Sequence, residues 1–92
     1  MIEGFRHKGL KALFEQDDPS KVRHEYAARI RLILSVLDAA GVIEDIAQPT
    51  FRLHPLKGDL GGLWAVTVRA NWRIVFRFED CGVHDVDMID YH

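Results

Sequence analysis

Apolar and other residues alternate along residues 63–78, LWAVTVRANWRIVFRF, and this alternation predicts two β-strands joined by a tight turn near Asn71. The pairing register decides which side chains share a face, because a one-residue slip moves every side chain to the opposite face. A two-residue turn at Ala70-Asn71 would mix apolar and charged side chains on both faces. A three-residue turn, residues 70–72, pairs Arg69 with Arg73. It places the large apolar side chains on one face and the charged side chains on the other. We therefore predict the three-residue turn, or any turn that keeps both arginines on one face.

The predicted register produces one apolar face and one face that carries arginines. The apolar face consists of Trp64, Val66, Val68, Ile74, Phe76 and Phe78. The other face consists of Thr67, Arg69, Arg73, Val75 and Arg77.

Helical periodicity marks two segments that precede this hairpin. Residues 7–15 predict one helix, and residues 19–40 predict a second, with apolar residues every three or four positions. Asp18 or Ser20 can cap the second helix, and Gly41 can end it. Its apolar positions are Val22, Tyr26, Ile30, Ile33, Leu37 and Ala40. Its solvent-facing side is expected to carry Arg23, Glu25, Arg29 and Arg31.

The remaining segments predict short strands and turns. We expect an edge strand at residues 2–5, a short strand at 51–53, a loop at 54–59 and a last strand at 83–91. Two helices followed by antiparallel strands predict a single α+β domain, residues 1–92, with the helices packed on one face of a small sheet. The uncovered face, with Arg69 and Arg73, is predicted to be exposed and partly basic.

Composition narrows the class of protein. The chain of 92 residues is 48% hydrophobic and 28% charged, which is ordinary for a small globular domain. It has no apolar run of about 18 residues and no signal-peptide pattern, so we expect a cytoplasmic protein that does not enter a membrane. The single cysteine, Cys81, excludes an internal disulfide, and the five histidines show no zinc spacing.

Charge is distributed unevenly along the chain. The net charge is −2, which alone argues against a nucleic-acid binder. Residues 51–77, however, carry 5 Lys/Arg against 1 Asp/Glu, and residues 78–92 carry 5 Asp/Glu and no Lys or Arg. Such blocks arise from cross-strand ion pairs or from a local cationic site in an acidic protein.

Three groups of residues are candidates for chemistry. Arg69 and Arg73 are either solvated residues paired with Asp85, Asp87 and Asp90, or a phosphate clamp, since guanidinium forks match phosphate oxygens. Lys57 lies in a glycine-containing loop and reaches a phosphate only if that loop folds over the open face.

The third group is the terminal sequence Asp90-Tyr91-His92. Terminal residues are usually inert, but a histidine can transfer a proton at neutral pH and a tyrosine can stack on a base. Adjacent strand residues point to opposite faces, so Tyr91 and His92 share one site only if the chain bends there. Together the three groups suit cleavage of RNA without a metal or other cofactor, in which the 2′-hydroxyl attacks the adjacent phosphorus.

The segments FRHKGLKALFE, LHPLKGD and VRANWRIVFRF, with the ending DYH, closely resemble HigB toxins of the RelE/ParE superfamily of type II toxin–antitoxin systems. The resemblance implies a RelE-like fold and a ribosome-dependent endoribonuclease that cleaves mRNA in the decoding (A) site. It also implies neutralisation by a HigA-type helix-turn-helix antitoxin and contact with operator DNA only through that antitoxin. The implied active surface comprises His54, Lys57, Arg69, Arg73, Asp90, Tyr91 and His92.

The resemblance also implies roles for these residues. Arg69, Arg73 and Lys57 would contact phosphate and the transition state, and His92 would transfer a proton. Tyr91 would orient the nucleotide and Asp90 would position or tune a neighbour. His54 would either contact RNA or only shape its loop.

Two alternatives stay open at this stage. One is a non-nucleolytic toxin of the ParE kind, although the Lys, Arg, Tyr and His set has no obvious use there. The other is an attenuated toxin that acts mainly by binding its antitoxin and repressing transcription. Attenuation would follow if Asp85 and Asp87 raise the pKa of His92 or repel the phosphate of the substrate.

Overall fold

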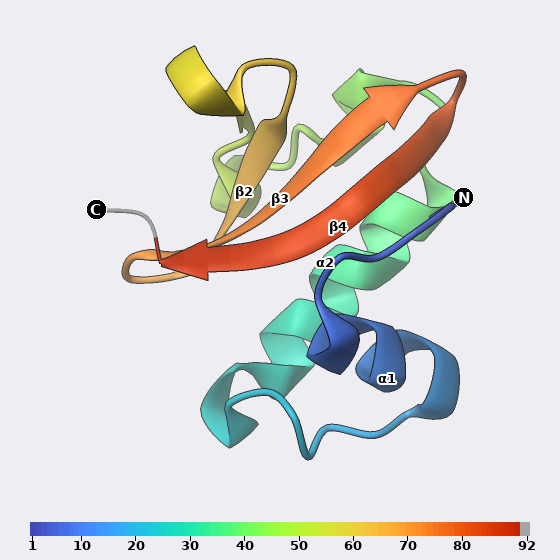
Figure 1. The fold of residues 1–92 in the computed structure, drawn as a ribbon, viewed down its shortest axis with the longest axis vertical. Coiled ribbons are helices and arrows are strands. Elements are labelled where there is room, and N and C mark those ends of the chain that lie inside the picture. The colour runs from blue at the N-terminus through green and yellow to red at the C-terminus, as the bar shows by residue number, and fades with distance from the viewer. Residues whose placement is uncertain (91–92) are drawn as a thin grey trace.

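A computed structural model of the chain describes residues 1–90, which form two α-helices and a four-stranded antiparallel sheet (Figure 1). The strands are β1 (His54–Pro55), β2 (Trp64–Arg69), β3 (Trp72–Glu79) and β4 (Gly82–Asp90), and they neighbour one another in chain order. The predicted α+β fold with antiparallel strands is therefore confirmed.

Helix α1 (Lys8–Gln16) lies where the periodicity predicts it. The His7 ring supplies its N-cap, because the Leu10 amide donates to Nδ1 at 3.1 Å. The αL conformation of Asp17, with φ of 54°, ends the helix.

Helix α2 (Ala27–Ala39) begins later than the predicted residue 19. Residues before it form turns, because the Ser20 amide donates to the Asp18 carboxylate at 3.0 Å and the Val22 amide donates to the Pro19 carbonyl at 3.2 Å. Asp18 therefore caps a turn instead of the helix, and a 3₁₀ turn at His24–Tyr26 leads into α2.

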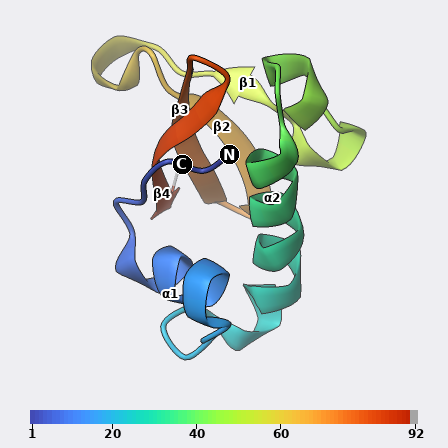
Figure 2. The ribbon, with the colours of Figure 1, turned by 90° about the vertical axis from the view of Figure 1, so that its right-hand side faces the viewer.

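The main core lies between the helices and one face of the sheet (Figure 2). The predicted apolar positions of α2 contribute to it, with Ile30, Ile33 and Leu37 fully buried and Val22 and Tyr26 packed at its margin. The sheet contributes Val66, Val68, Ile74, Phe76, Val83 and Val86, all buried. Trp64 and Phe78 pack against this core, so the predicted apolar face of the hairpin is confirmed.

Arg29 is not a solvent-facing residue of α2, contrary to the sequence prediction. Its guanidinium donates to the Thr50 carbonyl at 2.7 Å and to the Thr67 carbonyl at 3.0 Å. It also lies 5.0 Å from the centre of the Phe51 ring, in cation–π geometry. Arg29 thus ties α2 to the middle of β2, a contact that the helical periodicity does not indicate.

The predicted three-residue turn between β2 and β3 is wrong. The turn has two residues, Ala70 and Asn71, and the pairs on either side are Arg69 with Trp72 and Thr67 with Arg73. The register shift places one extra residue, Val68, in β2 as a β-bulge. The bulge lets the hairpin keep a clean apolar face and still use a tight turn, so Arg69 does not pair with Arg73.

Two other short segments differ from or refine the sequence prediction. The predicted strand at 51–53 is wrong, because Pro49–Phe51 is a 3₁₀ turn and Arg52 has φ of 51°. Phe51 is fully buried, and this burial draws the turn against the core. The extended residues are instead His54 and Pro55, which belong to the predicted 54–59 loop and pair with Ala65 and Trp64 of β2.

The N-terminal segment lies along β4, as expected for an edge strand. Ile2 bridges Val83 and Phe5 bridges Val86, both in parallel orientation. β4 is therefore covered on both edges, by β3 and by this segment.

The second face of the sheet is less exposed than predicted. Buried Leu56, Ala65 and Val75 form a small apolar cluster on it, with Leu63 and Ile89 packed alongside. Leu56 and Leu63 come from the loop between β1 and β2, and the Leu56 amide donates to the Leu63 carbonyl at 2.9 Å. This loop therefore folds over part of the face, which is the arrangement that a role for Lys57 requires.

Candidate functional site

Arg73 is held by the backbone of the hairpin turn. Its Nη1 donates to the Ala70 carbonyl at 2.6 Å and to the Trp72 carbonyl at 3.2 Å. Its Nε is buried and has no hydrogen-bond partner among the described residues. An unsatisfied buried donor costs about 1–3 kcal/mol, so an orphan guanidinium N–H is a plausible sign of a site for an anionic acceptor.

Arg69 lies on the other side of the sheet from Arg73. It stands opposite Trp72, which packs against the main core, and it lines a hollow with Glu25 and Tyr26 at the start of α2. Arg73 stands between Thr67 and Ile89, and Ile89 belongs to the second face. A single clamp in which both arginines hold one phosphate from one face is therefore wrong.

The two arginines nevertheless share one end of the sheet with the end of β4. Arg69, Trp72 and Asp90 form a row across β2, β3 and β4. Figure 1 shows the β2–β3 turn beside the end of β4. Two strand spacings separate Arg69 from Asp90, or about 10 Å. Tyr91 and His92 follow Asp90 in the chain and lie outside the described residues.

His54 lies on the second face with Arg73. It heads a row that runs through Ala65 and Val75 to Asp87. Its Nδ1 lies 2.9 Å from the Arg52 carbonyl, which can only accept a hydrogen bond, so Nδ1 carries the proton. Nε2 is then the ring atom left to accept a proton from a ligand.

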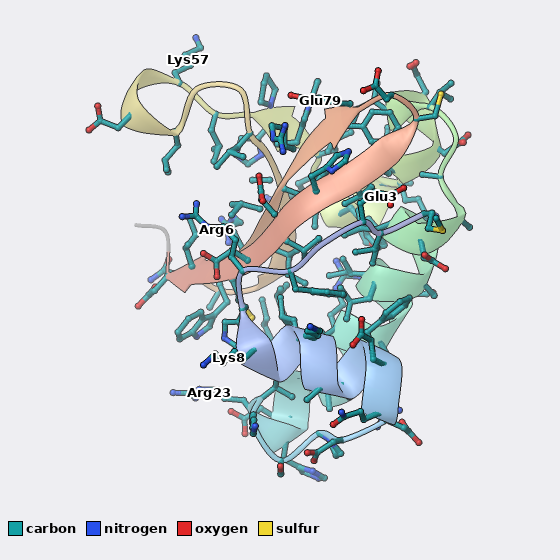
Figure 3. All side chains as sticks on the ribbon, turned by 45° about the vertical axis from the view of Figure 1, so that its right-hand side comes forward. Glu3, Arg6, Lys8, Arg23, Lys57 and Glu79 are labelled. Carbon is teal, nitrogen blue, oxygen red and sulfur yellow. The ribbon has the colours of Figure 1, made fainter. Side chains whose placement is uncertain are left out.

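Lys57 lies on the loop between β1 and β2 and is exposed. Figure 3 shows its side chain directed outward from that loop, away from the sheet. The side chain of Lys57 is therefore directed away from the sheet, although its loop packs on the same face as Arg73.

Arg77 shares the second face but its charge is already compensated. It pairs with Glu79 at 2.7 Å and with Asp85 at 3.1 Å. The hydrogen bonds that Arg77 donates to Glu79 and, next in size, to Asp85 raise the pKa of Arg77. The positive charge of this face that is free to meet a ligand therefore comes from Arg73 and not from Arg77.

Sequence reasoning missed Glu25 and Tyr26 as neighbours of Arg69. They form a hollow of about 320 Å³ with it, because the bulge in β2 turns Arg69 toward the start of α2. The alternation of apolar and polar residues along β2 does not indicate a contact between Arg69 and residues 25–26. Within residues 1–90, no group of three or more His, Cys, Asp or Glu side chains is placed to hold a metal ion.

A sequence model described as the RelE-like toxin of the type II toxin–antitoxin system HigB matches residues 3–92. The chain belongs to the HigB-like toxin family. Endoribonuclease HigB of Proteus vulgaris is 45% identical over 92 residues, which is 100% of both chains.

Solved structures of similar fold support the HigB-like assignment at the level of architecture. YafQ from Escherichia coli BL21(DE3) has a TM-score of 0.66 at 14% identity, covering 96% of this chain and 91% of YafQ. A chain of the heterotetrameric YoeB–YefM toxin–antitoxin complex of Staphylococcus aureus has a TM-score of 0.61 at 18% identity, covering 100% and 98%. At these identities the likeness concerns the fold alone.

The family result confirms the predicted HigB toxin and, with the structural neighbours, the predicted RelE-like α+β fold. The predicted endoribonuclease activity agrees with the name of the 45% identical relative, Endoribonuclease HigB. As a toxin of a type II system, this HigB-like chain has an antitoxin as its partner. Among the described residues, no helix has the length and apolar character needed to span a membrane.

Proposed function

We propose that this HigB-like toxin is an endoribonuclease that cleaves mRNA on the ribosome, at the end of the sheet where the β2–β3 turn meets β4. The observation that carries the proposal is Arg73, whose Nη1 is fixed by two turn carbonyls while its buried Nε has no partner among the described residues. Such an arrangement is preorganised for a phosphate, because the two carbonyl contacts fix the guanidinium and its Nη2 makes no hydrogen bond with another described residue. The relative named Endoribonuclease HigB supports the same activity.

The proposed reaction is attack of the ribose 2′-hydroxyl on the adjacent phosphorus. A bond forms between the 2′-oxygen and phosphorus, and the bond to the 5′-oxygen breaks, leaving a cyclic phosphate and a 5′-hydroxyl. Arg73 stabilises the negative charge of the transition state. His92 is the proposed proton-transfer residue, with Tyr91 orienting the nucleotide and Asp90 tuning its neighbours.

The separation of the two arginines changes their proposed division of labour. Arg73 contacts the cleaved phosphate from the second face, and Arg69 contacts the RNA strand from the helix side of the same sheet end. Lys57 and His54 approach from β1 and its loop, where Lys57 neutralises backbone charge and His54 Nε2 faces the ligand.

The acidic end of the chain gives little support to an attenuated toxin. Asp85 is paired with Arg77, and the Asp87 carboxylate accepts a hydrogen bond from the Met88 amide at 2.9 Å. Asp85 and Asp87 are therefore already engaged in contacts within the sheet. No contact among the described residues favours the non-nucleolytic alternative.

The proposed partners follow from this reaction. The antitoxin is proposed to be of the HigA type, with a helix-turn-helix that binds operator DNA, so that the toxin reaches DNA only through it. The substrate is proposed to be mRNA in the ribosomal A site, which places the toxin in the cytoplasm.

Primer extension on translated mRNA tests the proposal. Induced expression of the native protein should arrest growth and produce cuts within translated reading frames. His92→Gln should relieve the arrest and remove the cuts, because the proposed proton donor or acceptor is lost. The matched control is His24→Gln, which changes an exposed histidine at the start of α2 and should leave both readouts unchanged. Absence of cuts with the native protein would overturn the nuclease proposal.

A further inference from the structure

The hollow between the start of α2 and the bulge in β2 has no role in the reaction as described. It is lined by Glu25, Tyr26 and Arg69 and encloses about 320 Å³, which is at the lower end of the size of small-ligand sites. Arg69 connects it to the proposed cleavage site, since the row from Arg69 through Trp72 ends at Asp90.

We propose that this hollow binds one nucleotide next to the cleaved phosphate, and that Glu25 selects adenine and cytosine, whose exocyclic amino group stands where guanine and uracil have a carbonyl. The inference rests on the proposed endoribonuclease function and adds a base-selecting subsite to it. Its three lining side chains supply the three kinds of contact that a single-stranded nucleotide needs: an aromatic ring, a hydrogen-bond acceptor and a cation.

Tyr26 is the proposed stacking surface. It is half-buried at the margin of the main core, so its ring is held in place by packing. The Arg23 guanidinium lies 5.8 Å from the ring centre, which shows that a flat cationic group already fits against it. The Arg23 side chain is 60% exposed, so a base can displace it from the ring at little cost.

Glu25 is the proposed selector. Its carboxylate pairs with Arg23 at 3.2 Å and is 64% exposed, so it remains accessible from the hollow. A carboxylate can only accept hydrogen bonds, and the exocyclic amino groups of adenine and cytosine donate them. Uracil and guanine have a carbonyl at the corresponding position, so they would be repelled.

Arg69 is the proposed phosphate contact of this nucleotide. It is exposed, and it makes no hydrogen bond or ion pair with any other described residue. Figure 3 shows Arg6, Lys8 and Arg23 on the side of the molecule where β4 ends. An RNA strand that leaves the cleavage site toward the hollow therefore meets positive charge, although the chain carries a net charge of −2.

Nucleotide titration of the purified protein, followed by NMR, tests the subsite without relying on cleavage. AMP, CMP and UMP serve as probes. AMP and CMP should shift the Glu25, Tyr26 and Arg69 signals and bind about tenfold more tightly than UMP, as expected for one hydrogen bond to a charged group. Glu25→Gln should reduce that ratio toward one, because an amide can donate as well as accept. The matched control, Glu44→Gln, changes an exposed glutamate far along the chain and should keep the ratio.

Tyr26→Leu separates stacking from folding. Leucine keeps apolar packing at the core margin but loses the ring, so AMP binding should weaken about tenfold while thermal unfolding shows a folded protein. Shifts confined to other residues, or equal affinity for all three nucleotides, would overturn the subsite.

Mapping of cut sites in translated mRNA completes the test and separates the two proposals. The native toxin should cut with a preference for adenine or cytosine at one position beside the cleaved bond, and Glu25→Gln should lose that preference while still cutting. Cuts without nucleotide binding in the hollow would leave the nuclease proposal standing and overturn the subsite. Nucleotide binding without cuts would overturn the nuclease proposal and, with it, the role of the hollow in cleavage.

Discussion

The two faces of the sheet differ in how much they bury and in what they expose. The helix-covered face holds a continuous core in which Phe51, Phe76 and the buried residues of α2 have no exposed surface. The second face holds three buried residues, Leu56, Ala65 and Val75, under a loop. The first face therefore supplies most of the stability, while the second leaves room for His54, Arg73 and Asp87.

Substitutions on the two faces should therefore affect different properties of the protein, folding stability on one face and activity on the other. Changes on the helix-covered face should act through the free energy of unfolding. Changes on the second face should act mainly through RNA cleavage, because its apolar cluster is small and the hydrogen bonds of His54, Arg73 and Asp87 join only residues close in sequence. Arg77 is the exception, since it is paired with Asp85 and Glu79.

The largest expected effect is on the helix-covered face. Phe76→Ala removes a fully buried ring and should lower the free energy of unfolding by about 4 kcal/mol, a large part of the stability of a small domain. Urea denaturation followed by circular dichroism measures this loss. Phe14→Ala, which changes an exposed aromatic residue of α1, is the control. A loss below 1 kcal/mol for Phe76→Ala would contradict the central place of that face.

The next effect is on the second face and should appear in activity. Arg73→Lys keeps the charge but loses the planar fork, so cleavage should fall about 100-fold, as on losing one preorganised donor at a transition state. Unfolding should change little. Arg77→Lys, on the same strand and face, is the matched control and should retain cleavage. Full activity of Arg73→Lys would show that the fork of Arg73 is not used.

The smallest expected effect tests whether the small cluster positions the Lys57 loop. Leu56→Ala should cost about 2 kcal/mol, at the lower end of the range for a buried leucine, because the cluster is small and Leu56 directly follows the edge strand β1. Cleavage should fall while most of the protein stays folded. Leu60→Ala changes a leucine of the same loop that is 38% exposed, and it should alter neither readout. Unchanged cleavage with Leu56→Ala would remove Lys57 from the site.

The apolar pattern was sufficient to predict the layers of this fold. Spacing of three and four located the face of α2, and alternation located the core face of the hairpin, because both follow directly from burial. The start of α2 was not predictable from spacing, since Val22 fits the helical pattern yet lies in a turn. Local hydrogen bonds of Asp18 and Ser20 outweighed the propensity of residues 19–23 for helix.

The site was predicted less completely than the fold. Two arrangements of the hairpin produce the same apolar face, a three-residue turn or a two-residue turn with a bulge, and only the pairing distinguishes them. The two-residue turn with a bulge, which the structure has, places Arg69 on the opposite side of the sheet from Arg73. Arg29 was missed because the carbonyls of Thr50 and Thr67 that it binds come from distant segments, which periodicity along one helix cannot indicate.

The parallel contacts of the N-terminal segment with β4 bear on when the protein becomes active during its synthesis. Ile2 and Phe5 emerge well before their partners Val83 and Val86, which are far later in the sequence. Contacts this distant in sequence form slowly and only once both segments are available. A nascent chain therefore cannot complete its sheet, or the sheet end that carries Asp90, while β4 is still being synthesised.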